Sequence, residues 1–188
     1  MPREIRRCNC AGKDPLYIDY HDTEWGIPIY DDRLLFKSLL LETFQSGLSW
    51  ITILKKRENF SKSFDNFNYL KISNYSDEKL ELLLNDQKII RHKGKIKASI
   101  INANAFIKIQ DEFESFSNYI WSFVKNQPIR NSFKHTKEIP SKTELSNKIS
   151  QDLRKRGFKF VGPITIYSFM QAIGIVNDHT TNCFKYKK

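Results

Sequence analysis

Apolar residues recur along most of this chain every three or four positions, and strict alternation of apolar and polar residues is rare. This spacing gathers apolar side chains on one face of a helix, so the pattern predicts an all-α fold. The clearest case is residues 93–110, where Ile96, Ile100 and Ala103 fall on roughly one face of a long helix. We find no internal repeat, low-complexity tract or β-rich run.

Residue types that begin helices divide the chain further. Asp31 or Asp32 can cap a helix ahead of an apolar run, Ser76 precedes an acidic pair that suits a first helical turn, and Pro163 suits a first helical position. The polar, proline-containing stretch 127–143 predicts a loop. Besides 93–110, helices are expected over 32–54 as a linked pair, from 76 onward, and over 116–124, 144–156 and 163–173.

The net charge of the chain limits which kinds of binding partner are expected. The chain has 188 residues, of which 31 are Lys or Arg and 21 are Asp or Glu, for a formal net charge of +10. A basic surplus favours nucleic acid first and an anionic membrane surface second, although no amphipathic helix with a basic face supports the membrane. We find no signal peptide, no apolar run of membrane-spanning length and no glycine-rich nucleotide loop, so we expect a cytoplasmic protein without a nucleotide cofactor.

A basic segment between two expected helices is the first candidate for chemistry. Residues 153–165 contain two glycines that permit a tight turn and leave N–H groups free at the start of the next helix. Together with positive charge, this suits a DNA phosphate backbone gripped without reading its sequence. The alternative is an ordinary turn after a solvated basic helix. The candidate DNA-binding residues are Lys155, Arg156, Gly157, Lys159 and Gly162, with Arg154 nearby.

Cysteine and histidine residues near the two ends of the chain form a candidate metal set. His179 and Cys183 are four positions apart and share a face if the segment is helical, and Cys8 and His21 are the other candidate pair. Two Cys and two His ligands would close the tetrahedral shell of one structural zinc ion, which would tie the termini together. Cys10 competes with Cys8 as a ligand, and coincidental spacing is the alternative.

Glu42 is a carboxylate within an otherwise apolar helical segment. It is either at an exposed edge or buried, and burial requires a partner. Tyr17, Tyr20 and Trp50 are near it in sequence and could stack on a flipped base, whose polar edge the carboxylate would bind. The alternative is a surface carboxylate beside core aromatics, and the residues alone leave both open.

Five strings taken together resemble the bacterial 3-methyladenine DNA glycosylase I family, known as Tag. They are 14–26 (DPLYIDYHDTEWG), 41–59 with QSGLSWITILKKREN at its end, 89–96 (IIRHKGKI), 121–124 (WSFV), and 155–179, which begins KRGFKFVG and ends VNDH. They follow one another in order over nearly the whole chain, which makes the match far more specific than a short motif. The resemblance implies a helix-hairpin-helix glycosylase fold in one unit over 1–188, with the hairpin motif at about 145–175.

The resemblance also implies roles for the candidate residues. It assigns the zinc ligands to Cys8, His21, His179 and Cys183, within terminal segments 8–21 and 179–183. It leaves Cys10 as a bystander. It maps the base pocket onto Glu42 as the catalytic residue and onto Tyr20 and Trp50, with Tyr17 close by.

Three positions refine this interpretation. The Tag family commonly has a pocket Trp two residues after the first zinc cysteine, and this chain has Cys10 there. Related bifunctional glycosylases have a Gly-x-Lys-Thr pattern after the hairpin, whereas Ile164 stands here in place of the lysine, so no Schiff base is expected. Asp178 resembles the catalytic aspartate of the wider superfamily, but Tag proteins are known for lacking that residue, so a structural role is expected.

The resemblance therefore implies a DNA-repair enzyme. We expect a monofunctional glycosylase that removes 3-methyladenine from double-stranded DNA, holds one structural zinc ion, acts as a monomer and works at the bacterial nucleoid. Two alternatives remain open: a zinc-stabilised DNA-binding module without catalysis, and a glycosylase with a broader range of alkylated purines.

Overall fold

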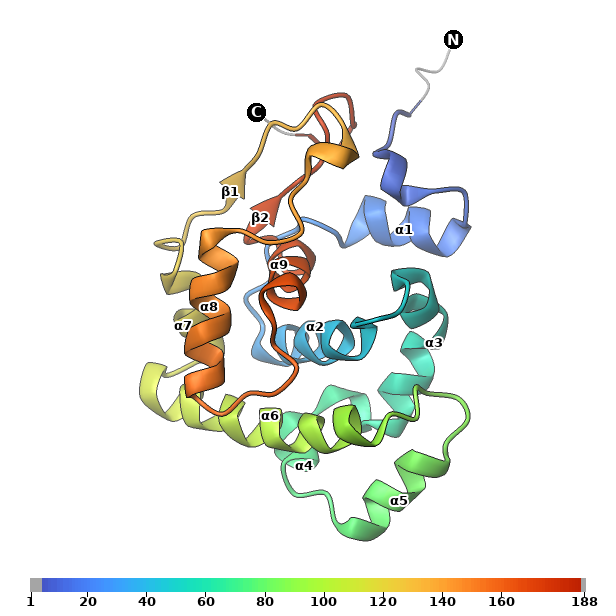
Figure 1. Ribbon diagram of the computed structural model, residues 1–188, viewed down its shortest axis with the longest axis vertical. Helices are drawn as coiled ribbons and strands as arrows, with labels where there is room; N and C mark the ends of the chain where they lie inside the picture. The colour runs from blue at the N-terminus through green and yellow to red at the C-terminus, as the bar shows by residue number, and fades with distance from the viewer. Residues whose placement is uncertain (1–4, 187–188) are drawn as a thin grey trace.

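The computed structural model describes residues 5–186, so the outermost residues of the expected 1–188 unit lie outside it. The expectation of an all-α fold is confirmed, since nearly all regular structure is helical (Figure 1). The α-helices are α1 (Pro15–Thr23), α2 (Asp32–Gln45), α3 (Trp50–Ser63), α4 (Tyr69–Ile72), α5 (Asp77–Asn85), α6 (Lys93–Phe113), α7 (Phe116–Ser122), α8 (Glu144–Lys155) and α9 (Pro163–Ala172). Short 3-10 helices occupy Asn9–Ala11, Asp65–Phe67 and Thr136–Glu138, and the two-residue strands β1 (Ile129–Arg130) and β2 (Val176–Asn177) pair in parallel.

The expected helix starts are confirmed by their caps. Asp31 caps α2, since its carboxylate accepts a hydrogen bond from the Leu34 N–H at 2.9 Å, and Ser76 accepts one from the Lys79 N–H at 3.3 Å. Asp32, the other candidate for the α2 cap, instead binds the first N–H groups of α7 at Phe116 and Ser117. The pattern did not indicate α1, which buries only Tyr20 and His21 and so lacks a long apolar stripe.

The core lies where α2 and α9 cross near the middle of the molecule, with α6 beside them (Figure 1). The end of α9 requires a glycine: Gly174 has φ +72°, and a Cβ atom there would lie 2.4 Å from the backbone of Ile27 and Pro28. This close approach brings the segment after α1 against α9. The first and last described segments meet at one end of the molecule, where the Phe184 N–H donates to the Arg6 carbonyl at 2.9 Å.

Candidate active site and metal centre

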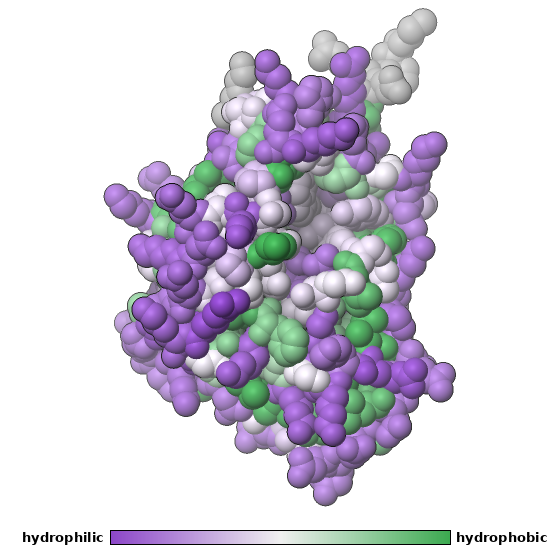
Figure 2. Space-filling model, in the orientation of Figure 1, coloured by the Kyte–Doolittle hydropathy of each residue, from purple (hydrophilic) through white to green (hydrophobic). Residues whose placement is uncertain are grey.

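A cavity of about 310 Å³ opens on the face seen in Figure 2, where a hollow is visible. Residues from α1, α2, α3 and α9 border it. All four residues predicted to bind or act on a base, Glu42, Tyr17, Tyr20 and Trp50, line this cavity. The other lining residues are Cys10, Ala11, His21, Trp25, Gln45, Thr136, Ile139, Ser168 and Gln171.

Glu42 is buried in the cavity wall, with an exposed fraction of 3%. Its carboxyl oxygen Oε2 has no hydrogen-bond partner among the described residues, and the buried indole N–H of Trp50 also has none. Burial raises the pKa of Glu42 to about 8. Because buried polar groups are normally hydrogen-bonded, an unpaired acid and an unpaired donor in the wall of one cavity indicate a site that a polar ligand completes.

Aromatic rings form the sides of this cavity. The rings of Tyr20 and Trp50 lie 5.2 Å apart between centroids at an angle of 52°, and Tyr17 and Tyr20 are stacked at 6.3 Å. Burial raises the pKa of Tyr17 to about 12 and that of Tyr20 well above its usual value, with Glu42 contributing in both cases. Both phenols therefore stay protonated near neutral pH, and each can donate a hydrogen bond to a ligand.

Four buried metal-binding side chains meet near the ends of the chain. The ligand atoms of Cys8, His21, His179 and Cys183 all lie within 4.8 Å of one another. Cys8 Sγ and Cys183 Sγ are each 3.6 Å from His179 Nδ1, and Cys183 Sγ is 3.6 Å from His21 Nε2. Zn–S bonds of about 2.3 Å and Zn–N bonds of about 2.0–2.1 Å at the tetrahedral angle put sulfur and nitrogen about 3.6 Å apart, so the group could hold such an ion.

Neighbouring groups orient these ligands. His21 Nδ1 lies 2.7 Å from Asp22, whose carboxylate also binds Arg7, and His179 Nε2 lies 3.1 Å from the Trp25 carbonyl. Such partners fix the ring tautomer that leaves the other nitrogen for a metal. Cys8 Sγ accepts hydrogen bonds from the N–H and hydroxyl of Thr180 at 3.3 and 3.4 Å, which favours its thiolate form.

The spacing of His179 and Cys183 suggested that the two side chains could share one face of a helix. The structure brings them together in a different way. Residues 178–186, the described part of the segment after β2, contain turns and no helix, and the Cys183 N–H donates to the Thr180 carbonyl at 2.8 Å. Cys10 lies beside Cys8, and the interaction of the two sulfur groups lowers the pKa of Cys8 and raises that of Cys10. Cys10 is not part of the four-residue group and instead faces the cavity.

Asp178 is fully enclosed by donors. It is 1% exposed and accepts hydrogen bonds from Tyr167 at 2.7 Å, from Gln171 at 2.7 Å and from Asn131 at 2.6 Å. These contacts join α9, β2 and the chain just after β1. They fit the structural role expected from the sequence, since they leave the carboxylate oxygens occupied.

The basic hairpin joins α8 to α9 as predicted. Gly157 has φ +96°, a conformation that favours glycine, and Gly162 caps α9 through its backbone alone. Phe158 and Val161 anchor the loop in the core at 2% and 1% exposure. The first N–H groups of α9 are therefore presented without a capping side chain, as an anion site at a helix start requires.

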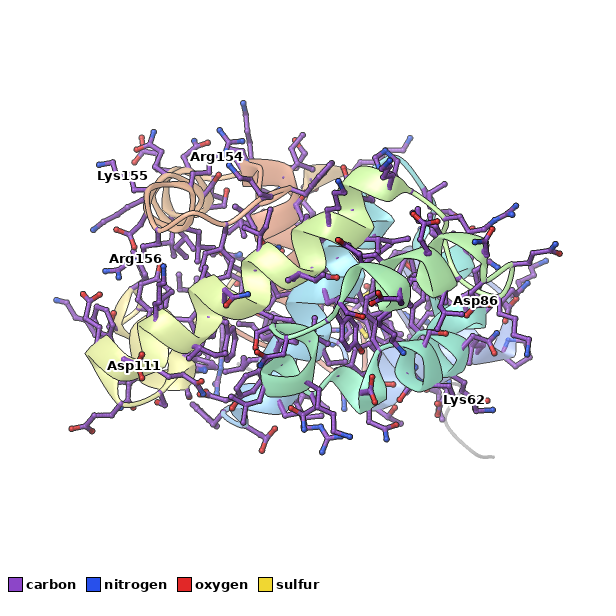
Figure 3. The ribbon with its side chains drawn as sticks, turned by 90° about the horizontal axis from the view of Figure 1, so that it is seen from below. Lys62, Asp86, Asp111, Arg154, Lys155 and Arg156 are labelled. Atoms are coloured by element: carbon purple, nitrogen blue, oxygen red, sulfur yellow. The ribbon has the colours of Figure 1, made fainter. Side chains whose placement is uncertain are left out.

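The three basic side chains predicted to contact DNA have different surroundings. Lys155 and Lys159 are exposed and make no salt bridge among the described residues. Arg156 binds Glu112 at 2.6 Å and Asp152 at 2.8 Å, and its guanidinium covers the rings of Phe113 and Tyr119. Figure 3 shows Arg156 on the side of α8 that faces α6, with Arg154 and Lys155 away from it.

A family model described as methyladenine glycosylase matches residues 10–186, which is nearly the whole chain. The chain belongs to the methyladenine glycosylase family. It is 48% identical to DNA-3-methyladenine glycosylase 1 of Escherichia coli (strain K12) over 182 residues, which cover 97% of both chains. The predicted resemblance is thereby confirmed.

Solved structures of family members have the same fold. A crystal structure of 3-methyladenine DNA glycosylase I (TAG) superposes with a TM-score of 0.94 at 48% identity and covers 97% of this chain and 100% of its own. A Staphylococcus aureus TAG structure, described as the structural basis of 3-methyladenine recognition, superposes with a TM-score of 0.93 at 36% identity, covering 97% of both chains.

Several cavity residues of this methyladenine glycosylase were not predicted. Trp25 and Gln171 lie in the wall, and their sequence neighbourhoods belong to the strings that resemble the family. Thr136 and Ile139 come from the stretch expected to be a loop, which contributes to the cavity wall. No local pattern marks these two positions, because their place depends on chain segments far away in sequence.

Proposed function

We propose that this protein is a DNA glycosylase that hydrolyses the N-glycosidic bond of 3-methyladenine in alkylated double-stranded DNA. The observation that carries the proposal is the buried, unpaired Glu42 carboxyl group in an aromatic-lined cavity. A base rotated out of the duplex is recognised by stacking on aromatic rings and by hydrogen bonds to its polar edge. The names of the similar proteins, each a 3-methyladenine glycosylase, support the same reaction.

Methylation at N3 gives the nucleoside's adenine a positive charge, and this charge makes the base a good leaving group. The bond between C1′ of the sugar and the base breaks, and its electron pair neutralises the base. A water oxygen then bonds to C1′ and releases its proton. The protein need not protonate the base, so its main tasks are to extrude, hold and orient the nucleotide.

Glu42 selects the charged base in this scheme. Its pKa of about 8 means that the carboxyl group is mostly neutral in the ligand-free protein at pH 7. A cation bound beside it favours the ionised form, and the carboxylate then accepts hydrogen bonds from the base N–H edge. Tyr17, Tyr20 and Trp50 supply faces that stack on the cationic ring. An undamaged, neutral adenine gains no such charge pairing.

The hairpin anchors the duplex in this proposal. Lys155 and Lys159 contact phosphates with their ammonium groups, and the N–H groups at the Gly162 end of the hairpin bind a phosphate at the start of α9. Arg156 contributes through the fold, since its ion pairs hold the end of α8 against α6. Gly157 permits the turn that places these groups together.

The group of Cys8, His21, His179 and Cys183 would hold a single zinc ion, since three of its sulfur–nitrogen distances are 3.6 Å, the separation expected between ligands of a tetrahedral ion. With all four positions taken by the protein, such an ion would supply cross-linking and no reaction chemistry. It would hold His21, and thus the helix α1 that carries Tyr17 and Tyr20, to the C-terminal segment.

Base removal without strand cleavage follows from the residue after Pro163. Ile164 is 58% exposed beside the hairpin and offers no amine for a Schiff base. Treatment of a reaction mixture with borohydride should therefore trap no covalent protein–DNA adduct, whereas a lyase in a parallel reaction should be trapped. We further propose that the enzyme acts as a monomer, which sedimentation with and without duplex DNA can test.

The direct test is release of free base from methylated duplex DNA, resolved by chromatography. Wild type should release 3-methyladenine, and Glu42→Gln should lower kcat/KM by about 10²–10³-fold, the usual effect of losing one preorganised electrostatic group. Glu58→Gln is the matched control, because Glu58 is an exposed carboxylate on α3 outside the cavity.

No release by folded, zinc-loaded wild type would exclude the enzyme and leave the DNA-binding module. Unchanged kcat/KM in Glu42→Gln would retain the enzyme but exclude the role given to Glu42. Release of 7-methylpurines at a comparable rate would replace the narrow substrate range with the broader one.

A further inference from the structure

Two buried polar side chains on α6 belong neither to the cavity nor to the metal-binding group. Lys95 is 5% exposed and Asn102 is 3% exposed, in a helix whose other buried residues are mostly apolar. They are seven positions apart, so they lie two turns apart on one face, about 10 Å along the helix axis. Each forms its hydrogen bonds with the backbone of a different loop.

Lys95 holds the loop between α2 and α3. Its Nζ donates to the Phe44 carbonyl at 2.8 Å and to the Ser46 carbonyl at 2.6 Å, and it forms no salt bridge among the described residues. The last carbonyls of α2 carry the negative end of the helix dipole and attract the ammonium group, while burial lowers the pKa of Lys95. This loop links Gln45 to Trp50, which both line the cavity.

Asn102 holds the hairpin. Its Oδ1 accepts from the Lys159 N–H at 2.8 Å and its Nδ2 donates to the Lys159 carbonyl at 3.1 Å. The ring of Phe160 also lies edge-on to His92, which caps the start of α6, at 5.9 Å between centroids. The tip of the hairpin is therefore bound to α6 through both backbone groups of one residue.

We propose that α6 is a rigid spacer that sets the distance between the DNA anchor and the base cavity, with Lys95 and Asn102 as its positioning residues. The inference rests on the proposed function: a duplex held at the hairpin delivers its extruded base to the cavity only if the two loops keep one separation. A 21-residue helix that crosses the molecule provides that rigidity (Figure 3).

The test distinguishes damage to either loop from a change in the distance between the two loops. Lys95→Met keeps the aliphatic stem and removes the donor, and Lys97→Met, at an exposed lysine on the same helix, is the control. Three quantities are measured: affinity for undamaged duplex, affinity for free 3-methyladenine, and kcat for excision. In Lys95→Met the two affinities should stay within twofold of wild type, whereas kcat should fall about 10–100-fold, as small misplacements of reacting groups do.

Lys95→Arg, which keeps a cationic donor, should restore at least half of the lost activity on a logarithmic scale. Asn102→Leu should also lower kcat, and the double variant should lose no more than the worse single variant, because either change releases the same spacing. Residues this far apart normally have additive effects, so additive losses would contradict the spacer. If Lys95→Met does not fold, Lys95→Gln replaces it in the same comparison.

Unchanged kcat in folded Lys95→Met would overturn the inference, and so would a fall in free-base affinity that accounts for the lost activity, because Lys95 would then support the cavity alone. Wild type on the same methylated duplex keeps the two proposals distinct. If wild type releases no base, the proposed function fails. If wild type is active and the α6 variants match it, only the spacer fails.

Discussion

Glu42 and Asp178 are both buried carboxyl groups, at 3% and 1% exposure, yet their surroundings are opposite. Asp178 accepts hydrogen bonds from three side chains, whereas Oε2 of Glu42 has none among the described residues. Gln171 links the two regions, because it donates to Asp178 and also lines the cavity that contains Glu42.

This difference indicates a structural role for Asp178 and a ligand-binding role for Glu42. A buried acid surrounded by donors contributes to the fold, and changing it should mainly lower stability. A buried acid without a partner costs stability in the free protein and gains its partner when a ligand arrives. The carboxylate of Asp178 is therefore fully bound by side chains of the protein itself, while the Glu42 cavity is complete only with a base.

The largest expected effect would come from removing the metal ligand next to Asp178. His179→Ala should abolish tight metal binding, which in small zinc proteins contributes on the order of 10 kcal/mol to folding, as much as a typical domain's whole stability. We expect little folded protein, measured by metal content per chain and by thermal unfolding. Cys10→Ala, which leaves the four ligands in place, should keep one metal ion, and loss of metal there would mean that Cys10 is a ligand.

The next effect concerns Glu42 and pH. The unfolded chain loses this proton near the ordinary pKa of 4.5, whereas the folded protein keeps it up to about 8, so the folded state binds more protons in between. The free energy of unfolding must therefore fall as pH rises through this window, by on the order of 5 kcal/mol. Glu42→Gln should remove that fall and be the more stable protein at pH 8.5. Parallel stability–pH curves for the two proteins would contradict the raised pKa.

Asp178→Asn should lower stability, in contrast to the gain expected for Glu42→Gln. The amide cannot accept from all three donors, so we expect a loss of about 1–3 kcal/mol in denaturant unfolding at pH 7. Excision by the folded variant should stay within tenfold of wild type, because Asp178 occupies no position in the cavity wall. A variant of normal stability without activity would assign Asp178 a catalytic role and contradict the structural role given to it here.

The smallest effect should come from Cys10, which lines the cavity where the family commonly has Trp. Cys10→Trp adds one stacking surface, and base–aromatic stacking contributes about 1–3 kcal/mol. Affinity for free 3-methyladenine should rise at least about fivefold, measured by titration calorimetry. Weaker binding would mean that this chain's cavity has been reshaped around the smaller side chain.

Much of the site could be predicted because its residues sit in long strings that match a known family. Tyr17, Tyr20, Glu42 and Trp50 do share a cavity, and the four metal-binding residues do meet. The ion pair between Arg156 and Glu112 could not be predicted, because the basic run 154–156 looks uniform in sequence and Glu112 is 44 residues away on α6. The second ion pair of Arg156, with Asp152, is local, since the two residues are four positions apart.

Helical periodicity and end caps such as Asp31 and Ser76 act over a few residues, so the amino-acid sequence alone accounted for most of the helices, although not for α1. It also determined the turn at Gly157, which depends on local backbone freedom. The tertiary structure alone decided that Glu42 is left without a partner, that Asp178 is enclosed and that Lys95 joins α6 to the end of α2. These are relations between segments tens of residues apart, and side-chain burial there depends on how whole helices pack.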